Sequence, residues 1–347
     1  MKPLVTALID TYNHERYIEQ ALVSVLEQGL SPAELEIVVV DDGSTDETPA
    51  IIQKFVPRVK HVRKENGGQA SAFNVGFAAS RGEIVAILDG DDWWAKRKLA
   101  VVLKALETNS EVAAVGHGYH EFDEQTKQTR VCVPPARRVV NMATPEAARA
   151  ACTAWPYLLM GALTVRRKVL EWIMPIPEEM VFMADTAIQA AAIFMGTLVL
   201  QEPLSYYRRH AQNLYAIDPK DTSSLRRRYE MTELAYRGVS QRLIELGVRK
   251  ECVSMLFSEA WVAVKRERLS RFGGDRLEAF RTEMQAFHAS FTNPSAGYRL
   301  FKYLVVGAGT MILPPRQFYG IRQWYAKRHL GRYRDWVFRQ DETGWHD

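Results

Sequence analysis

The first half of the sequence alternates short, continuously apolar runs with stretches in which apolar residues recur every three or four positions. The stretches at residues 4–9, 36–40, 59–62 and 83–88 predict strands, and the one at 36–40 is too continuously apolar to face water. The stretches between them predict helices, most regularly at residues 18–26. This alternation predicts an α/β fold with a mainly parallel sheet flanked by helices.

Capping signals indicate where two of these helices begin. Asn13 is a candidate N-cap for the helix at residues 18–26, and Gly29 stands just beyond its end. Ser44 and Glu47 have the spacing of a capping box in front of the next helix. Both signals predict that the loops after the first two strands serve to start helices.

The second half follows a different pattern. Residues 112–165 predict short strands and loops, followed by a helix at about 185–195 and a strand at about 197–200. From about residue 218 to 288 the pattern is helical and strongly charged. The chain of 347 residues is therefore expected to hold one core domain and an appended helical region.

Composition excludes several classes of protein. The three cysteines are widely spaced, so they favour neither a disulfide framework nor a zinc site, and a reducing compartment fits best. No apolar run reaches the roughly 18–20 residues that a membrane-spanning helix needs. The start of the chain lacks the layout of a signal peptide. We therefore expect a cytoplasmic protein.

The C-terminal segment concentrates positive charge. The net charge of the chain is only +4, yet residues 299–334 contain lysines and arginines, several aromatic residues and no acid. Such a segment favours the surface of an anionic membrane, while the alternative is a helical hairpin packed on the protein with a solvated basic face. No nucleic-acid-binding module accompanies the charge, so no nucleic-acid partner is expected.

Two predicted strands end in carboxylates, namely Asp41 and Asp42 after the second and Asp89, Asp91 and Asp92 after the fourth. Ligands of open parallel sheets bind at the carboxyl ends of the strands. Asp89 and Asp91 stand two residues apart, so they can converge on one cation, and Mg²⁺ or Mn²⁺ would offset their repulsion. The alternative is that Asp91 or Asp92 simply caps the following helix.

The loop "RKENGGQASAFN" at residues 63–74 is glycine-rich and basic, and it precedes a predicted helix. Its backbone amides could bind phosphate or sugar oxygens. It matches neither the G-x-G-x-x-G dinucleotide pattern nor a P-loop, and by itself an ordinary glycine turn explains it as well.

Together these motifs resemble the family-2 glycosyltransferases of GT-A fold. Residues 3–214 carry the resemblance through "TYN" at 11–13, "SVLEQ" at 24–28, "VVVDDGSTD" at 38–46, "NGGQASAFN" at 66–74, "LDGDD" at 88–92 and "EPLSYYRRHAQN" at 202–213. The resemblance implies a Rossmann-like GT-A domain, followed here by a C-terminal helical region. It also implies metal-dependent transfer, with inversion, from a nucleotide-diphosphate sugar to a hydroxyl acceptor such as a glycan or lipid-linked glycan in polysaccharide biosynthesis. Mg²⁺ or Mn²⁺ would be the cofactor, and a UDP-sugar is the favoured donor.

The resemblance assigns roles to individual residues. The nucleotide would lie against Thr11, Tyr12, Asn13, Asp41, Asp42, Asn66, Gly67, Gly68, Gln69 and Asp89. The metal ligands would be Asp91, Asp89 and His210. Sugar or acceptor contacts are expected from Trp93, Trp94, Asp92 and Arg208, although adjacent tryptophans more often include one core residue. Phe73 stands where many members carry arginine, so Lys64, Arg208 or His210 would contact the diphosphate instead.

An inverting enzyme also needs a base for the acceptor hydroxyl. The resemblance selects Asp185 in "VFMADTAIQ", although Ala184 replaces the glutamate that is usual before it. Glu178 or Glu179 is the alternative base, and Asp185 could instead be a plain N-cap of its helix.

These expectations divide the chain into a catalytic domain at 1–214, a helical region at 215–293 and a basic amphipathic tail at 294–347, which would place the enzyme peripherally on the inner face of the cell membrane.

Two rival functions remain open. One is a phosphotransferase that uses a strand-end aspartate as nucleophile, which would leave "TYN" and "NGGQ" unexplained. The other is a non-catalytic, membrane-associated scaffold that binds sugar nucleotides, against which the intact acids at 89, 91 and 92 argue.

Overall fold

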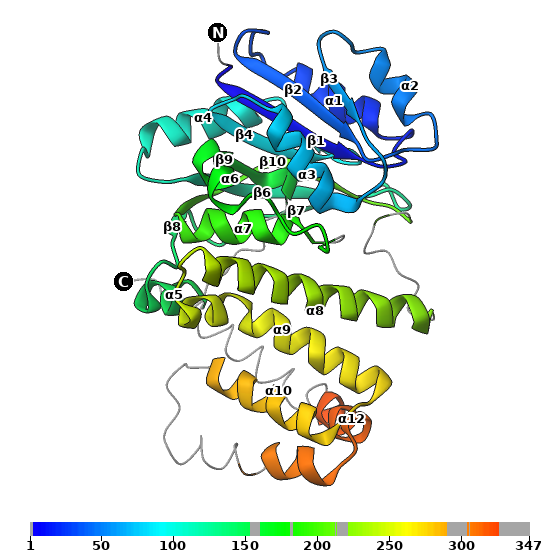
Figure 1. Ribbon diagram of the computed structural model, residues 1–347, viewed down its shortest axis with the longest axis vertical. Coiled ribbons are helices and arrows are strands. Elements are labelled where there is room, and N and C mark those ends of the chain that lie inside the picture. The colour runs from blue at the N-terminus through cyan, green and yellow to red at the C-terminus, as the bar shows by residue number, and fades with distance from the viewer. Residues whose placement is uncertain are drawn as a thin grey trace. The chain divides into compact units, whose positions relative to one another are not determined.

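The apolar run after Leu4 forms the central strand of a mixed sheet (Figure 1). This strand, β1 (Val5–Thr11), lies between β2 (Leu35–Asp41) and β4 (Ile84–Asp89), and β3 (Lys60–Arg63) pairs with β2. All four strands are parallel, so β1, β2 and β4 end at the same edge. The computed structural model describes residues 3–152, 160–180, 183–211, 213, 221–289, 304 and 306–325.

The rest of the sheet is mixed, in the order β3-β2-β1-β4-β9-β6-β10-β5. β9 (Leu163–Arg166) is antiparallel to both β4 and β6 (Ala114–Asp123), and β10 (Thr197–Arg209) is parallel to β6. β5 (Trp93–Trp94) and β8 (Arg138–Val140) pair with β10, and β7 (Thr129–Cys132) pairs with β6. The parallel centre and the flanking helices confirm the predicted fold class, and β10 is much longer than its apolar start indicated.

Alternating residues of the central strands bury opposite faces of the sheet. Ile9 and Val39 belong to a core shared with α1 (Ile18–Leu26), α2 (Thr48–Gln53) and α4 (Lys98–Thr108). Leu8 and Val40 point the other way, against Gly76 of α3 (Gly68–Ala79), where any larger side chain would collide with them. Each fully buried aliphatic side chain contributes about 1.5–3 kcal/mol, so this two-sided burial stabilises the sheet.

Both predicted helix caps are wrong. Asn13 adopts a left-handed φ of 55° and accepts a hydrogen bond from the Thr45 backbone N–H (2.8 Å), while α1 begins after Tyr17 without a side-chain cap. Ser44 receives the Asn13 backbone N–H instead of capping α2, which begins after Glu47. These polar side chains bind the neighbouring loop rather than a helix end, so they tie the ends of β1 and β2 together.

Further helices follow the sheet strands. These are α5 (Pro145–Cys152), the short 3₁₀ turn η1 (Met160–Ala162), α6 (Arg167–Ile173) and α7 (Asp185–Phe194), and then α8 (Thr222–Glu245), α9 (Lys250–Phe272), α10 (Arg276–Ala289) and α12 (Pro315–Tyr325). The chain divides into two compact units, Met1–Leu256 and Phe257–Asp347. Among the helices that are described, none has the length and apolarity needed to cross a membrane.

The second unit has its own small core. Leu269, Ala279 and Tyr319 are buried together, and Phe318 packs against them. Glu283 is almost fully buried and accepts hydrogen bonds from Arg266 (2.8 Å) and from Arg322. Much of the basic tail predicted at 294–347 lies outside the described residues, but α12 belongs to this unit.

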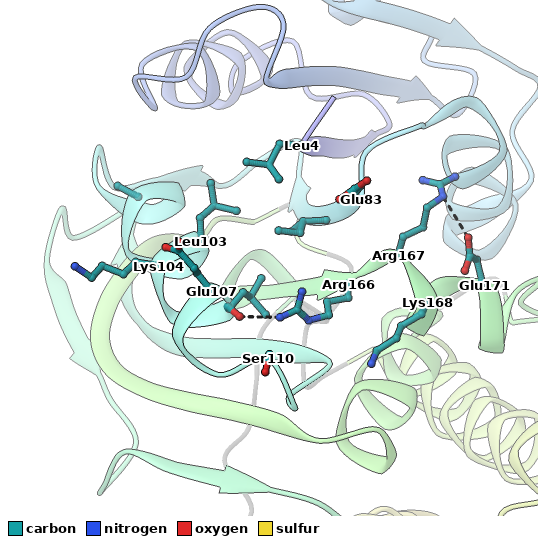
Figure 2. A pocket seen from close by; sticks show the side chains of 13 residues that line it. Leu4, Glu83, Leu103, Lys104, Glu107, Ser110, Arg166, Arg167, Lys168 and Glu171 are labelled. Carbon is teal, nitrogen blue, oxygen red and sulfur yellow. Dashed lines mark hydrogen bonds and ion pairs between the residues drawn. The ribbon is translucent and has the colours of Figure 1, made fainter. Parts of the chain in front are cut away.

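A cavity of about 890 Å³ lies at the opposite edge of the sheet, where β1 and β4 begin (Figure 2). Arg166 in its wall donates to the Leu106 and Val112 carbonyls, at 2.7 and 2.9 Å. Arg167 donates to the Ser80 carbonyl (2.8 Å), lies over the Phe77 ring and points toward Glu171 (Figure 2). Both arginines therefore bind carbonyl groups at or just after the C-terminal ends of α4 and α3. These contacts give this part of the cavity wall a role in stabilising the fold.

Replacing Arg167 by methionine should destabilise the first unit. The change removes charged hydrogen bonds to carbonyls at the end of α3, each contributing about 1.5–3 kcal/mol, so the thermal midpoint should fall by several degrees. Lys168→Met is the matched control, because Lys168 is exposed, and it should shift the midpoint little. Thermal unfolding followed by circular dichroism compares the two, and equal shifts would refute the capping role.

Candidate active site

Asp91 lies in the turn after β4 and is surrounded by nitrogen atoms. Its Oδ2 lies 3.0 Å from His210 Nε2 and accepts a hydrogen bond from Asn213 Nδ2 at 3.2 Å. His14 Nε2 is 3.9 Å from the same oxygen. Burial alone would raise the pKa of Asp91, but the His210 hydrogen bond and the nearby imidazoles hold it below its usual value. Asp91 is therefore a carboxylate that stays ionised, and His210 lies beside it.

A second group of carboxylates lies on the face of the sheet that α3 covers. Asp10 is the register partner of Asp89, so their side chains share this face at the carboxyl edge. Burial, then the charge of Asp91, raises the pKa of Asp10 to about 7, and Oδ1 of Asp10 has no hydrogen-bond partner among the described atoms. Burial, then Asp10, raises the pKa of Asp89 well above its usual value. Both acids therefore hold their protons to a higher pH than exposed carboxyl groups do.

Asp185 is the first residue of α7, and its charge acts on both Asp10 and Asp89. Oδ2 of Asp185 accepts a hydrogen bond from Gln189 Nε2 (3.1 Å), and burial raises its pKa to about 6. The helix N-cap is Ala184, so Asp185 is not the plain cap that was the alternative. Met183 just before it has a left-handed φ of 62°, a strained conformation of the kind found at functional sites.

The residues expected at the nucleotide lie along the ends of β1 and β2. Thr11 is buried and its Oγ1 lies 3.1 Å from His14 Nδ1, whereas Tyr12 is 43% exposed and open to a ligand. Asp41 is fully buried: Oδ1 accepts from the Ser44 N–H (2.8 Å), and Oδ2 has no hydrogen-bond partner among the described atoms. That Oδ2 atom lies 3.5 Å from Arg63 Nε and 3.8 Å from His61 Nε2. Tyr12 is therefore the group open to a ligand here, while Asn13 holds the loop.

Asp42 organises the glycine-rich loop. Its carboxylate accepts hydrogen bonds from Lys64 Nζ (2.6 Å) and from the backbone N–H groups of Gly67 (3.0 Å) and Gly68 (2.7 Å). Gly68 needs its left-handed φ of 82°, and Gly43 leaves room for the backbone of Asn66. Asn66 therefore lies in the loop against Gly43, and Gln69 lies in the first turn of α3. Asp42 and Lys64 form a pair that shapes the loop.

Two of the predicted sugar contacts are wrong. Trp94 is only 2% exposed and belongs to the core under α1 and α4, with Lys98 Nζ 3.6 Å from its ring centroid. Asp92 is also buried, and its Oδ1 accepts the Arg208 backbone N–H (2.8 Å). Neither Asp91 nor Asp92 caps α4, which begins after Arg97. Trp93 is half-buried, in contact with Arg208.

The sequence analysis missed three residues beside Asp91. Asp10 follows the predicted strand at 4–9 as Asp41 and Asp89 follow theirs, but only the latter two were assigned to the site. Asn213 is the last residue of the motif at 202–213 and His14 comes directly after "TYN", yet neither was assigned a role.

The donor set suits a hard divalent cation, because it offers carboxylates and an imidazole next to an unsatisfied carboxylate oxygen. Within the described part of the chain no three acidic, histidine or cysteine side chains are close enough to hold a metal ion alone. Asp91 and His210 would therefore supply few ligands, with water and phosphate oxygens completing the shell, as Mg²⁺ sites usually require.

The raised pKa of Asp10 predicts how pH changes stability. The folded chain keeps this proton up to about pH 7, while the unfolded chain loses it near pH 4, so the folded state binds more protons between these values. The contribution of Asp10 to the free energy of unfolding of the metal-free protein should therefore fall as pH rises from about 4 to about 7. Mn²⁺ offsets the ionised carboxylates, so it should raise the thermal midpoint more at pH 8 than at about pH 5.5.

Thermal midpoints across this pH range, with EDTA and with Mn²⁺, measure both effects. The difference in thermal midpoint between the wild type and Asp10→Asn, both metal-free, should shift against the wild type as pH rises from about 4 to about 7, because the variant lacks the group that titrates. Equal Mn²⁺ shifts at both pH values would contradict the prediction.

The fold and the site define a glycosyltransferase, and comparisons with known proteins agree. The chain belongs to glycosyltransferase family 2: the model of "Glycosyl transferase family 2" matches residues 6–171, and the uncharacterized glycosyltransferase alr2836 of Nostoc sp. is 33% identical over 70% of this chain and 76% of its own. The uncharacterized glycosyltransferase EpsJ of Bacillus subtilis is 29% identical over 63% of this chain and 65% of its own.

Solved structures confirm the GT-A type of fold. Residues 1–349 of S. aureus TarS match with a TM-score of 0.59 over 89% of this chain and 90% of that chain, at 18% identity. TarS has also been crystallised in complex with UDP and with UDP-GlcNAc.

Proposed function

We propose that this glycosyltransferase moves a sugar from a UDP-sugar to a hydroxyl acceptor with inversion, using Mg²⁺ or Mn²⁺. The observation that carries the proposal is the meeting of three groups at one sheet edge: the ionised Asp91 with His210, the carboxylates of Asp10 and Asp89, and Asp185 at the start of α7.

In this proposal the nucleotide lies along the ends of β1 and β2. Tyr12 is exposed enough to cover a base. Asp41, whose buried Oδ2 lies 3.5 Å from Arg63 Nε, would accept a hydrogen bond from a donor group of the base once this oxygen turns toward it. Asp91 and His210 would hold the cation under the diphosphate. The cation would stabilise the charge that develops on the leaving diphosphate. UDP is favoured because TarS, which shares the fold, binds UDP and UDP-GlcNAc.

Asp185 is the proposed base. Its pKa of about 6 keeps it ionised near neutral pH yet basic enough to accept a proton from a hydroxyl. Its influence on Asp10 and Asp89 supports a position beside the proposed donor site. Ionised Asp185 would take the acceptor proton as the hydroxyl attacks the anomeric carbon from the side opposite the diphosphate.

Release of nucleoside diphosphate from a panel of UDP- and GDP-sugars, with Mn²⁺ or with EDTA, tests the proposal. We expect slow Mn²⁺-dependent hydrolysis of at least one UDP-sugar even without acceptor. A phosphotransferase would instead release phosphate from simple phosphate esters, and a non-catalytic scaffold would bind UDP without releasing sugar. Either result would refute sugar transfer and support the corresponding rival function.

We also propose that the acceptor is presented at an anionic membrane, where the protein binds peripherally on the inner face. Within the second unit, Met311 and Ile312 just before α12 and Ile321 and Trp324 on α12 are exposed, and Ile312 is 69% exposed. Ile321 and Trp324 lie three residues apart on one helix, and the surrounding sequence contains no acid. Basic residues near such a surface contribute about 1 kcal/mol each, and apolar side chains add insertion energy.

The double variant Ile321→Gln, Trp324→Gln should lose most of its binding to anionic vesicles while keeping its fold. Leu234→Gln is the control, since Leu234 is also an exposed apolar residue but lies on α8 in the first unit. Co-sedimentation with anionic and neutral liposomes, at low and high salt, measures this. If both variants bind like the wild type, or if the wild type does not bind, α12 does not contact lipid.

A further inference from the structure

Six planar side chains lie one after another beside the Asp91 turn. We call it the planar column, and its members in order are His120, Tyr206, Trp93, Arg208, Tyr17 and His210. The ring centroids of His120 and Tyr206 are 4.5 Å apart, and those of Tyr206 and Trp93 are 4.7 Å apart with nearly parallel planes. At the other end, the ring centroids of Tyr17 and His210 are 4.6 Å apart, with their planes tilted by 43°. The column thus ends on the histidine that bonds Asp91.

Strand pairing places the sheet members of the column in line. Tyr206 on β10 is the register partner of both Trp93 on β5 and His120 on β6. Arg208 follows two residues later and so points to the same face, opposite Phe122, whose ring meets Trp93 edge-on at 5.6 Å. The register of the strands, and not one loop conformation, therefore places these four members of the column, whereas Tyr17 lies just before α1 and His210 just after β10.

Arg208 is the central member, and it is a buried cation. It is only 7% exposed, and its guanidinium carbon lies 4.5 Å from the Trp93 ring centroid and 4.7 Å from that of Tyr17. Its Nε donates to the Asp91 carbonyl (2.8 Å) and Nη2 donates to Gln20 Oε1 (2.5 Å). Burying a guanidinium is costly unless its donors and charge are satisfied, so the two rings and the Asp91 carbonyl hold it in one place.

Tyr17 links the position of Arg208 to that of the His210 imidazole. Its ring contacts both Arg208 and His210, and its hydroxyl donates to Glu124 Oε2 at 2.7 Å, which fixes the ring at its far end. The Asp91 turn is thus held at two points, through its backbone by Arg208 and through its carboxylate by His210.

We infer that Trp93 and Tyr17 are positioning residues, which keep Asp91 and His210 at the spacing needed to bind a cation with a diphosphate. The inference rests on the proposed function and adds to it, because it assigns the aromatic residues behind the site to donor binding rather than to sugar stacking. It also gives Arg208 a role behind the turn and not on the diphosphate. Groups that orient metal ligands commonly affect metal affinity about 10–100-fold.

Calorimetric titration of the folded protein with UDP in the presence of Mn²⁺ tests the inference without relying on turnover. Trp93→Leu and Tyr17→Leu should each weaken this binding about tenfold. Trp93→Phe and Tyr17→Phe keep a ring in the column and should restore most of the affinity. Phe194→Leu is the control for loss of a buried aromatic residue, since Phe194 lies at the end of α7 and outside the column. It should lower the thermal midpoint and leave UDP affinity unchanged.

The outcomes separate the two proposals. If the wild type does not bind UDP with Mn²⁺, both the proposed function and the positioning role are refuted. If the wild type binds and the two leucine variants bind equally well, only the positioning role is refuted. If Phe194→Leu weakens binding as much as Trp93→Leu does, the effect is general destabilisation and the column has no specific role.

Discussion

Replacing Asp91 by asparagine should reduce Mn²⁺-dependent sugar transfer by about 100–1000-fold, the size of effect seen when one group that stabilises transition-state charge is removed. The variant keeps the shape of the side chain but loses the ionised oxygen next to His210. Burial is costly for this carboxylate, and its neighbours nevertheless keep its pKa low, so the site is built to hold a charge at this position. Donor binding in the presence of Mn²⁺ should weaken as well.

The neighbouring acid provides the matched control. Asp92→Asn keeps the acceptor oxygen that binds the Arg208 backbone N–H, and burial already raises the pKa of Asp92 well above its usual value. This variant should therefore keep most of its activity and its Mn²⁺ dependence. Donor release measured over a range of Mn²⁺ concentrations compares the two. An Asp91→Asn enzyme with unchanged activity and Mn²⁺ dependence would remove Asp91 from the metal site.

The sheet could be predicted because its signal is local. The first, second and fourth apolar runs became β1, β2 and β4, whose ends at Thr11, Asp41 and Asp89 differ little from the predicted ones. Parallel strands end at a common edge, so the meeting of Asp41 and Asp89 at one edge followed from their positions alone.

Partners from distant segments could not be derived in this way. Asp91 and His210 are 119 residues apart, and only the family motif connected them before the structure did. Asp10 was missed because its importance depends on β1 lying next to β4, which sets it beside Asp89. Asn13 had the right residue type for a cap, but Thr45 from the neighbouring loop competed for its side chain.

Trp93 and Trp94 also show what could not be predicted from the sequence, here within a single strand. Neighbouring residues of a strand point to opposite faces, so one of the pair had to enter the core if α1 covered only one face. The sequence alone does not show which face that is. Trp94 entered the core, and Trp93 joined the planar column.

Replacing Asp185 by asparagine should lower turnover by about 100–10,000-fold while changing UDP affinity little, because a base acts on the acceptor and not on the nucleotide. The pH profile should support this role. Asp185 has a pKa of about 6 and must be ionised to accept a proton, so wild-type turnover should rise as pH increases through about 6 and then level off. Glu178→Gln and Glu179→Gln test the alternative bases and should remain close to wild type. Single-turnover transfer combined with calorimetric UDP binding separates the effects, and a loss of UDP affinity as large as the loss of turnover would place Asp185 in the donor site or in the fold.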